Sequence, residues 1–470
     1  MKSLSRIAVV LFLPMLGLIA AADAAAQSQR ALDARAKEAI EHWTPERRAA
    51  AIPRDLVIDE NGSAFLRGRD GSLTPYGHSA SATPMAGDGA GPTVTNMSPA
   101  AGATVGASAT FSATVTDASG VKSVSISVQQ GNGRAQSFSA GQGANNVWSV
   151  NLSGLTNGTW TWWVVAKDNG KPSTSTTSSK VTFTVNTSGG GGGGGGGGTV
   201  ANAQWTGQGV VQDAVGRIYF EMPDTAQRTR WSGYVCSGTV VNDGTTGRSI
   251  ILTASHCIYD DANKAFARKV LFIPDQAETT GTGTDLNCAN DPIGCWAPTF
   301  GVVDVNWTTR TFPNNVHWDY AFYVVKDAGA HTAGLSGAAD QLDAAVVAMD
   351  VSFAAPAAGS VTHALGYSYS VDPQFMYCAN PMQNMNADNW FLPNCGLTGG
   401  SSGGPWSQPF NVTTGNGPII SVNSWGYTNQ PGMAGPKLSG TTASCVFATA
   451  QSSAFGTYAD GEAGVKANCP

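Results

Sequence analysis

The chain has few charged residues and no excess of positive ones. Asp, Glu, Lys and Arg make up 12% of the 470 residues, and the formal net charge is -6. Soluble proteins usually contain about 25% charged residues. This composition excludes a basic surface for nucleic acid or anionic membranes, so we expect no nucleic-acid partner.

Long apolar runs are also missing, except near the start of the chain. Residues 7–21 are apolar but short for a membrane span, and they follow Lys2 and Arg6. Small residues ending Ala24-Ala25-Ala26 come next. This pattern predicts a cleavable export signal rather than the alternative, a membrane anchor. We therefore expect a secreted, extracellular bacterial protein with no membrane span after signal removal.

Cysteine does not occur before residue 236, and all eight cysteines lie between Cys236 and Cys469. An even number in an exported chain predicts a disulfide framework. Zinc is not expected, because no C-x-x-C pair has a matching His or Cys pair. The expected chemistry demands no metal or organic cofactor, and structural calcium is the one alternative left open, although no D-x-D-type loop points to a site. Proximity along the chain suggests three pairs, with other pairings open: Cys288–Cys295, Cys378–Cys395 and Cys445–Cys469.

A run of ten glycines, Gly189 to Gly198, is the clearest boundary in the sequence. Such a run has no side chains to bury and predicts a flexible linker. Around it we divide the chain into a signal peptide (1–26), a pro-segment (27–90), a β-sandwich (91–188), the linker (189–198) and a C-terminal domain (199–470).

The pro-segment contains few elements. A helical pattern covers residues 32–43, and Thr44 with Pro45 predicts the N-cap and first turn of a second helix. Asn61-Gly62, between the apolar runs 56–58 and 64–66, predicts a hairpin. The segment is either an intramolecular chaperone or a plain spacer.

Residues 91–186 alternate apolar and polar side chains, which predicts short strands of a β-sandwich. The alternation is clearest at 111–115, 124–128 and 181–185. The segment resembles bacterial immunoglobulin-like domains. Trp160, Trp162 and Trp163 either bind glycans or a cell surface, or pack in the core.

Three motifs in residues 199–470 carry acid–base chemistry. Residues 250–257 form an apolar strand ending in Thr-Ala-Ser-His-Cys, which places His256 rigidly at a strand end. Residues 397–405, Leu-Thr-Gly-Gly-Ser-Ser-Gly-Gly-Pro, place Ser402 in a tight turn whose amides near Gly400 and Ser402 can face an oxyanion. A serine hydroxyl needs a base to become a nucleophile, and His256 is the candidate.

The order of these residues excludes one alternative. Gly400-x-Ser402-x-Gly404 also fits the nucleophile elbow of esterases, whose His follows the serine. The last histidine here is His363, so the esterase interpretation fails. The acid must then lie between His256 and Ser402. Asp319 precedes an apolar aromatic strand at residues 320–325, whereas Asp291 and Asp304 lack such a strand.

These motifs, together with Ser424-Trp425-Gly426, resemble the trypsin-like (chymotrypsin-fold) serine peptidases. Residues 216–220 and 236–239 are closest to the secreted microbial glutamyl-endopeptidase-like branch. The resemblance implies an all-β chain with a chymotrypsin-like double β-barrel after the immunoglobulin-like β-sandwich. It also implies a disulfide between Cys236 and Cys257.

The resemblance further assigns roles to site residues. It implies a catalytic triad of His256, Asp319 and Ser402. The oxyanion hole would be formed by Gly400 and Ser402, and the substrate backbone would pair with Ser424, Trp425 and Gly426. Ser401 stands where animal members have the Asp that pairs with the new N-terminus, so their activation route is not assumed. Gly396 and Leu397 suggest a neutral specificity pocket.

We therefore expect a secreted serine endopeptidase, made as a zymogen, that acts on protein or peptide substrates. The competing hypothesis is a non-catalytic adhesion or matrix-binding protein on a peptidase scaffold, with the immunoglobulin-like domain as its working part. Labelling of Ser402 by a fluorophosphonate separates the two.

Overall fold

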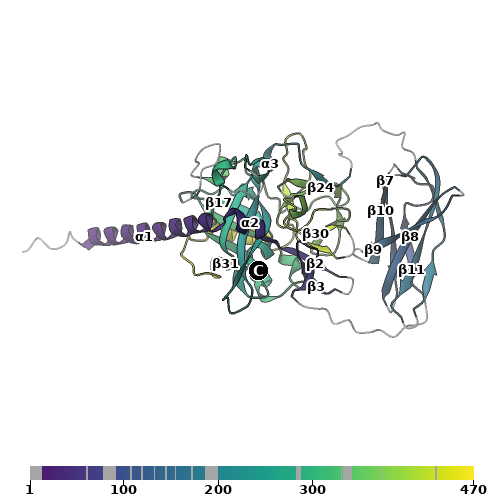
Figure 1. Cartoon of the computed structure of the whole chain (residues 1–470), viewed down its shortest axis with the longest axis horizontal. Coiled ribbons are helices and arrows are strands. Elements are labelled where there is room, and N and C mark those ends of the chain that lie inside the picture. Colours follow the sequence, from purple (N-terminus) through teal and green to yellow (C-terminus); the bar gives the residue numbers. More distant parts are fainter. Residues whose placement is uncertain are drawn as a thin grey trace, which may run out of the picture.

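A computed structural model describes residues 13–59, 62–77, 91–105, 108–117, 120–131, 133–142, 146–153, 155–170, 173–185, 199–281, 287–329, 331, 341–371, 373–428 and 431–470. The start of the predicted signal peptide, Asn61 of the predicted hairpin and the polyglycine linker lie outside these residues. The chain is all-β apart from a few helices (Figure 1).

The longest helix, α1 (Leu13–His42), begins well before the predicted 32–43 and runs through the predicted signal cleavage site. Helix α2 (Pro45–Ala50) has Thr44 as N-cap, as predicted, with the Arg47 amide donating to its hydroxyl. No helix in the described part of the chain combines the length and apolarity needed to cross a bilayer. The remaining helices are α3 (Val210–Ala214), α4 (Val305–Thr309), α5 (Leu342–Ala345) and α6 (Ala443–Ser452).

The predicted β-sandwich is confirmed as a two-layered strand assembly (Figure 1). Strands β5, β7 and β10 form one layer, and β8, β11, β12, β13 and β6 form the other; β9 pairs with both β10 and β8. Phe111 packs across the layers against Trp162 and Phe183. The strands are β5 (Thr93–Ser98), β6 (Thr104–Val105), β7 (Ser108–Thr116), β8 (Val121–Gln130), β9 (Gln136–Gln142), β10 (Val147–Ser153), β11 (Gly158–Asp168), β12 (Ser175–Thr177) and β13 (Val181–Val185).

The C-terminal part begins with an antiparallel sheet in the order β20-β15-β16-β17-β22-β21, to which β31 adds in parallel. Almost every apolar residue of its central strands is buried, because the sheet is covered on both faces. Its strands are β15 (Val215–Pro223), β16 (Trp231–Val241), β17 (Arg248–Thr253), β20 (Arg268–Pro274), β21 (Phe300–Asp304), β22 (Ala321–Lys326) and β31 (Gly464–Ala467). A short hairpin, β18 (Tyr259–Asp260) and β19 (Ala265–Phe266), follows β17.

There are two further sheets among the described residues, with orders β14-β24-β23-β27-β28 and β25-β26-β30-β29-β2-β3-β4; the last three strands, β2 (Asp55–Ile58), β3 (Ala64–Arg67) and β4 (Leu73–Pro75), come from the N-terminal segment. The loop that carries Ser402 connects β26 to β27, one strand from each sheet. The strands are β14 (Val200–Gln204), β23 (Val361–Gly366), β24 (Met376–Pro381), β25 (Gln383–Asn384), β26 (Asn389–Leu392), β27 (Pro405–Ser407), β28 (Ile419–Val422), β29 (Trp425–Tyr427) and β30 (Met433–Pro436).

The predicted pro-segment contributes strands to two of the sheets of the C-terminal part. Strand β1 (Ile52–Pro53) pairs in parallel with β16, and β2 (Asp55–Ile58) pairs in parallel with β29. The predicted hairpin is present as β2 and β3 (Ala64–Arg67), and β4 (Leu73–Pro75) extends it. A plain spacer would not share strands in this way, so that alternative is wrong for this stretch.

The side chains before β1 also dock on the first sheet. Trp43 is buried beside Tyr219, and its indole N–H donates to the Lys269 carbonyl. The His42 imidazole lies 2.9 Å from a carboxylate oxygen of Glu221. Truncation of a buried aromatic side chain of this size to Ala commonly lowers the free energy of unfolding by about 3–5 kcal/mol, so Trp43 is a principal anchor of the segment.

All eight cysteines are paired as the sequence suggested. The Cys445–Cys469 bridge ties α6 to the chain end after β31, and Cys378–Cys395 ties β24 to the loop that precedes Ser402. Disulfides restrict the conformations of the unfolded chain, and each typically adds about 2–4 kcal/mol to the free energy of unfolding.

Phe111→Ala should loosen the sandwich by opening a cavity between its layers, at a cost of about 3–5 kcal/mol. Hydrogen-exchange mass spectrometry of the full chain should show faster exchange in β7 and β11 and unchanged exchange in β17 and β22. Ser112→Ala, the half-buried neighbour on the opposite face of β7, is the matched control. Equal exchange in the two variants would contradict the packing described here.

Candidate active site

The centre of the site is a buried histidine–carboxylate pair. His256 Nδ1 lies 2.7 Å from Asp319 Oδ2, and the backbone N–H of His256 donates to Asp319 Oδ1 at 2.9 Å. The His256 side chain is 0% exposed and that of Asp319 is 1% exposed. A carboxylate that accepts from both the backbone and the ring holds the imidazole in one orientation and leaves Nε2 for other chemistry.

Strand pairing brings these two residues together. Strands β17 and β22 are antiparallel neighbours, and Thr253 at the end of β17 pairs with Ala321 at the start of β22. His256 and Asp319 therefore lie just beyond the same edge of the sheet. The Ser255 hydroxyl contacts the carbonyls of Trp318 and Tyr320, at 2.8 and 2.9 Å, and so ties the two loops to each other.

Asp304 was set aside in the sequence because no apolar aromatic strand follows it, and the structure has the helix α4 after it. It is the last residue of β21 and caps α4, accepting from the Asn306 amide at 2.7 Å. Its second oxygen accepts from the Thr442 hydroxyl. Asp304 therefore has a capping role, and His256 is paired with Asp319.

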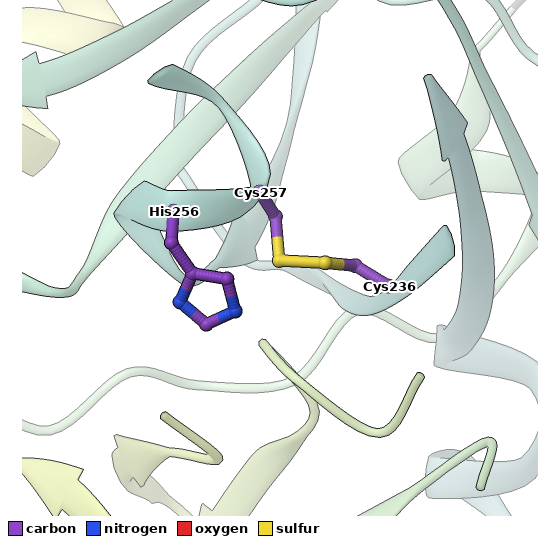
Figure 2. A group of neighbouring side chains, drawn as sticks. All are labelled: Cys236, His256 and Cys257. Carbon is purple, nitrogen blue, oxygen red and sulfur yellow. A yellow bond between two sulfur atoms is a disulfide. The ribbon is translucent and has the colours of Figure 1, made fainter. Parts of the chain in front are cut away.

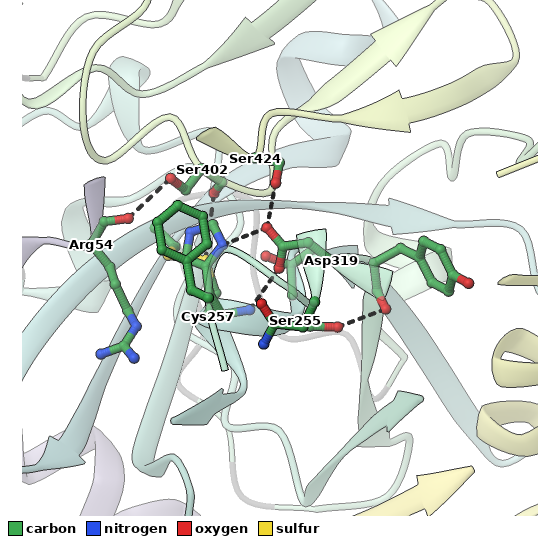
Figure 3. Close-up of polar contacts among 12 residues, drawn as sticks. Arg54, Ser255, Cys257, Asp319, Ser402 and Ser424 are labelled. Carbon is green, nitrogen blue, oxygen red and sulfur yellow. Dashed lines mark hydrogen bonds and ion pairs between the residues drawn. A yellow bond between two sulfur atoms is a disulfide. The ribbon is translucent and has the colours of Figure 1, made fainter. Parts of the chain in front are cut away.

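Ser424 completes the contacts of Asp319. Its hydroxyl donates to Asp319 Oδ2 at 2.5 Å, and the side chain is buried (Figure 3). The sequence interpretation placed Ser424 on a substrate-binding strand and missed this bond. Serine immediately before a Trp-Gly strand gives no local signal of a partner that is 105 residues away.

The predicted disulfide between Cys236 and Cys257 lies next to His256 (Figure 2). It joins β16 to the turn η2 (Ser255–Cys257) that carries the imidazole. Among the described residues, two clusters have the spacing of metal ligands: Cys236 with His256 and Cys257, and Cys288 with Asp291 and Cys295. In both clusters the cysteines are bonded to each other, so they offer no thiolate to a metal.

The turn around Ser402 depends on two glycines in the left-handed region. Gly400 has φ +94°, and a Cβ there would lie 2.9 Å from the Tyr367 carbonyl oxygen. Gly403 has φ +82°, and a Cβ there would lie 2.0 Å from the Thr253 hydroxyl oxygen. No other residue fits at either position without moving the backbone, so glycine at residues 400 and 403 is a geometric requirement of the turn.

Ser237 of β16 holds this turn from the other side and was not identified from the sequence. Its N–H donates to the Ser402 carbonyl at 2.7 Å, and its hydroxyl donates to the Gly400 carbonyl at 2.9 Å. The Ser402 carbonyl also lies 3.8 Å from Cys257 Sγ. Ser402 is thus fixed against the strand and disulfide beside His256. The role of the Gly400 and Ser402 amides in an oxyanion hole stays a prediction.

The predicted specificity residues lie before this turn. The Gly396 amide donates to the Ala201 carbonyl at 2.7 Å, which ties the backbone to β14. Leu397 is buried in a hydrophobic cluster with Trp390 and Trp406. Their part in substrate selection stays a prediction.

The Ser402 hydroxyl is occupied by the N-terminal segment. Ser402 Oγ donates to the carbonyl oxygen of Arg54 at 3.2 Å (Figure 3). His256 Nε2 is buried and has no hydrogen-bond partner among the described residues. A serine nucleophile must donate its proton to the base as it attacks a carbonyl carbon. Here the Ser402 hydroxyl donates to a carbonyl oxygen of the N-terminal segment.

The strand predicted to bind substrate backbone is occupied as well. Leu56, Val57 and Ile58 of β2 pair with Trp425, Gly426 and Tyr427 of β29. The Thr428 amide continues the ladder to the Ile58 carbonyl at 3.1 Å. On the other side of Ser402, the Arg54 amide donates to the Val235 carbonyl at 3.3 Å. The segment therefore pairs with the C-terminal part on both sides of Ser402.

Asp55 follows Arg54 and sits beside the imidazole. Burial raises the pKa of the Asp55 carboxyl to about 6, although Arg67, His256 and the Gly399 amide act in the opposite direction. Its side chain is 17% exposed and lies 3.7 Å from the Arg67 guanidinium. Ionised Asp55 is therefore less favourable in the docked segment than in water.

This shift sets a pH dependence for docking. A free Asp carboxyl titrates near 3.8 and docked Asp55 near 6, so the docked form holds its proton over a wider range. The Asp55 contribution favours docking at low pH, weakens as pH rises from about 4 to 6, and is constant above. Asp55→Asn, which cannot ionise, should bind at least about tenfold tighter at pH 7.5 and lose this dependence.

The measurement uses the full chain, folded and then cut at a sequence-specific protease site inserted in the polyglycine run. Dissociation of the N-terminal fragment is followed by size-exclusion chromatography at pH 5 and 7.5. Asp70→Asn, on an exposed turn of the same segment, is the control and should behave as wild type. An Asp55→Asn fragment with unchanged pH dependence would show that Asp55 does not control docking.

Comparison with known proteins identifies one part of the chain. Residues 92–162 match the family model of the bacterial Ig domain. No curated protein matches the chain. The bacterial Ig-like domain and the four disulfides fit an extracellular protein.

Two solved structures are similar over about a fifth of the chain. An endo-beta-1,4-mannanase from Thermotoga petrophila is 14% identical over 21% of this chain and 20% of its own, with a TM-score of 0.18. The Clostridium thermocellum CbhA fibronectin(III)-like modules are 21% identical over 20% of this chain and 97% of theirs, with a TM-score of 0.16. The chain thus spans about a fifth of the mannanase.

The suggested tryptophan surface of the Ig-like domain is wrong for Trp162. This side chain is fully buried, and its indole N–H donates to the Pro99 carbonyl at 3.0 Å. Trp160 is half-buried against the core and bonds the Thr156 carbonyl, and Lys180 lies over the Trp163 ring. Strand alternation explains why Trp162 is in the core and Trp163 is not, since neighbouring residues of β11 face opposite sides of the sheet.

Proposed function

We propose that the chain is a secreted serine endopeptidase of the trypsin-like type, with a double β-barrel C-terminal domain, kept latent by residues 51–58. The observation that carries this proposal is the buried His256–Asp319 hydrogen bond beside the tightly held Ser402 turn. In this proposal the Ig-like domain accompanies the enzyme and contacts glycans or a cell surface.

The proposed reaction uses the side chains of Ser402, His256 and Asp319. With Arg54 withdrawn, the Ser402 hydroxyl is free to donate to His256 Nε2. Oγ then attacks a peptide carbonyl carbon as Nε2 takes its proton, and Asp319 stabilises the imidazolium. The imidazolium returns the proton to the leaving amine, which leaves an acyl-enzyme. Water hydrolyses the ester by the same proton route in reverse.

Latency is supported by the same contacts. The Arg54 carbonyl accepts a hydrogen bond from the Ser402 hydroxyl, and β2 pairs with β29. Both must be released before substrate can enter. The adhesion hypothesis finds less support, because a scaffold without catalysis has no need of a buried imidazole with an unused Nε2.

The test compares the full chain before and after the engineered cut in the polyglycine run and removal of the N-terminal fragment. We expect slow fluorophosphonate labelling and little casein hydrolysis before, and at least about a hundredfold faster labelling after. Ser402→Ala should abolish labelling and reduce hydrolysis by about 10⁴-fold or more.

Ser370→Ala, an exposed serine that contacts Thr398 near the same turn, is the control and should label normally. Casein hydrolysis that survives Ser402→Ala would refute the proposed triad. A stripped wild-type chain that neither labels nor hydrolyses would favour the adhesion hypothesis instead.

A further inference from the structure

The Arg54 side chain occupies a fully buried pocket next to the nucleophile. Its carbonyl accepts from Ser402, while its guanidinium extends away from the serine (Figure 3). Isolated charges are costly to bury, so a buried guanidinium requires a site that matches it. The groups around it define that site.

Three side chains face the guanidinium: one carboxylate and two tyrosines. Asp260 Oδ2 lies 3.5 Å from Arg54 Nη2, and the Tyr234 ring lies 5.1 Å from Arg54 Cζ. Both belong to the C-terminal part, on β18 and β16. The third, Tyr76, belongs to the N-terminal segment, accepts from Arg54 Nη2 at 2.8 Å and donates to Asp261. Removal of the segment would therefore take away Arg54 and Tyr76 together.

The two carboxylates do not depend on Arg54 for their positions. Asp260 Oδ1 accepts from the amides of Ala262 and Asn263, at 3.0 and 2.8 Å. Asp261 Oδ2 accepts from the Phe312 amide at 2.6 Å and from Asn315 Nδ2 at 2.9 Å. These donors lie in the C-terminal part, so the acidic pocket stays formed when the segment leaves.

Burial raises the pKa of the Asp261 carboxyl, with Asp260 acting in the same direction and Tyr76, Phe312 and Arg54 opposing it. An emptied pocket thus keeps two close carboxylates but loses the guanidinium that faced them, and Lys264, the nearby cation of the C-terminal part, is held by the Thr308 and Arg310 carbonyls. A basic side chain relieves their repulsion and stacks on Tyr234.

We propose that Asp260, Asp261 and Tyr234 form a subsite that binds an Arg or Lys side chain of the substrate close to the scissile bond. This inference rests on the proposed peptidase function and adds its substrate class. Arg54 is then a substrate-like side chain that fills the subsite until the segment is displaced. The neutral residues Gly396 and Leu397 place no charge in the site, so the basic preference would come from the β18 side of the cleft.

The first arm of the test measures cleavage. The full chain is folded, cut in the polyglycine run and freed of its N-terminal fragment, and its products from a peptide library are sequenced by mass spectrometry. We expect Arg or Lys to be enriched at least about fivefold at one position within three residues of the cut. Peptide pairs with Arg or citrulline at that position should differ at least about tenfold in kcat/KM, because citrulline lacks the charge.

Asp260→Asn should remove most of this tenfold difference, and a circular-dichroism spectrum like that of the wild type shows that the variant folds. Asp350→Asn, an exposed carboxylate that contacts Asn242, is the matched control. The citrulline pair on the wild-type enzyme needs no variant, so the inference stays testable even where Asp260→Asn misfolds.

The second arm measures binding without catalysis. Calorimetry on stripped Ser402→Ala compares the peptide of residues 52–58 with its Arg54→Ala form, and we expect at least about tenfold tighter binding of the first. Normal fluorophosphonate labelling without any preference for Arg or Lys near the cut would overturn the subsite but not the peptidase proposal. The pocket would then serve only to dock the segment, whatever the calorimetry shows. Absent labelling of the wild-type protein would instead remove the peptidase proposal and this inference with it.

Discussion

The interaction on which the site depends is the burial of the Asp319 carboxylate among three donors. The His256 ring, the His256 backbone N–H and the Ser424 hydroxyl all point at its two oxygens. A carboxylate that is 1% exposed is tolerated only when it is fully satisfied. The cost of losing any donor therefore holds the loops after β17, before β22 and before β29 in one arrangement.

That arrangement limits what the Ser402 turn can do. Ser237, two glycines in the left-handed region and the Cys236–Cys257 disulfide fix the turn from the first sheet. The docked segment contacts the Ser402 hydroxyl through the Arg54 carbonyl, and His256 Nε2 has no partner among the described residues. In the proposed peptidase, this local contact would be enough to keep the site unreactive without any rearrangement of the sheets.

Local patterns were sufficient to predict much of the fold. Period-2 alternation identified Phe111, Ile126 and Phe183 as core, and Thr44-Pro45 located the start of α2, because these signals act over a few residues. Neighbouring cysteines paired as their spacing suggested. The apolar aromatic strand that follows Asp319 selected it over Asp304, which precedes a helix instead.

Contacts between distant segments could not be predicted in this way. Ser237, Ser424 and Arg54 carry no special local pattern, and each acts on a partner more than a hundred residues away. Trp162 was ambiguous for a related reason, since a Trp-x-Trp-Trp stretch alternates faces and only the packed layers show which face is inward.

The parallel pairing of β2 with β29 has a further consequence. While the chain is intact, the tether keeps β2 near β29 at an effective concentration on the order of millimolar, so even weak pairing remains saturated. After a cut, that concentration falls to the bulk concentration of the fragment, and the freed edge of β29 can accept another extended chain. In the proposed peptidase, dilution of the cut fragment outside the cell would then activate the enzyme. A crowded or confined space would keep the fragment bound and the enzyme inactive.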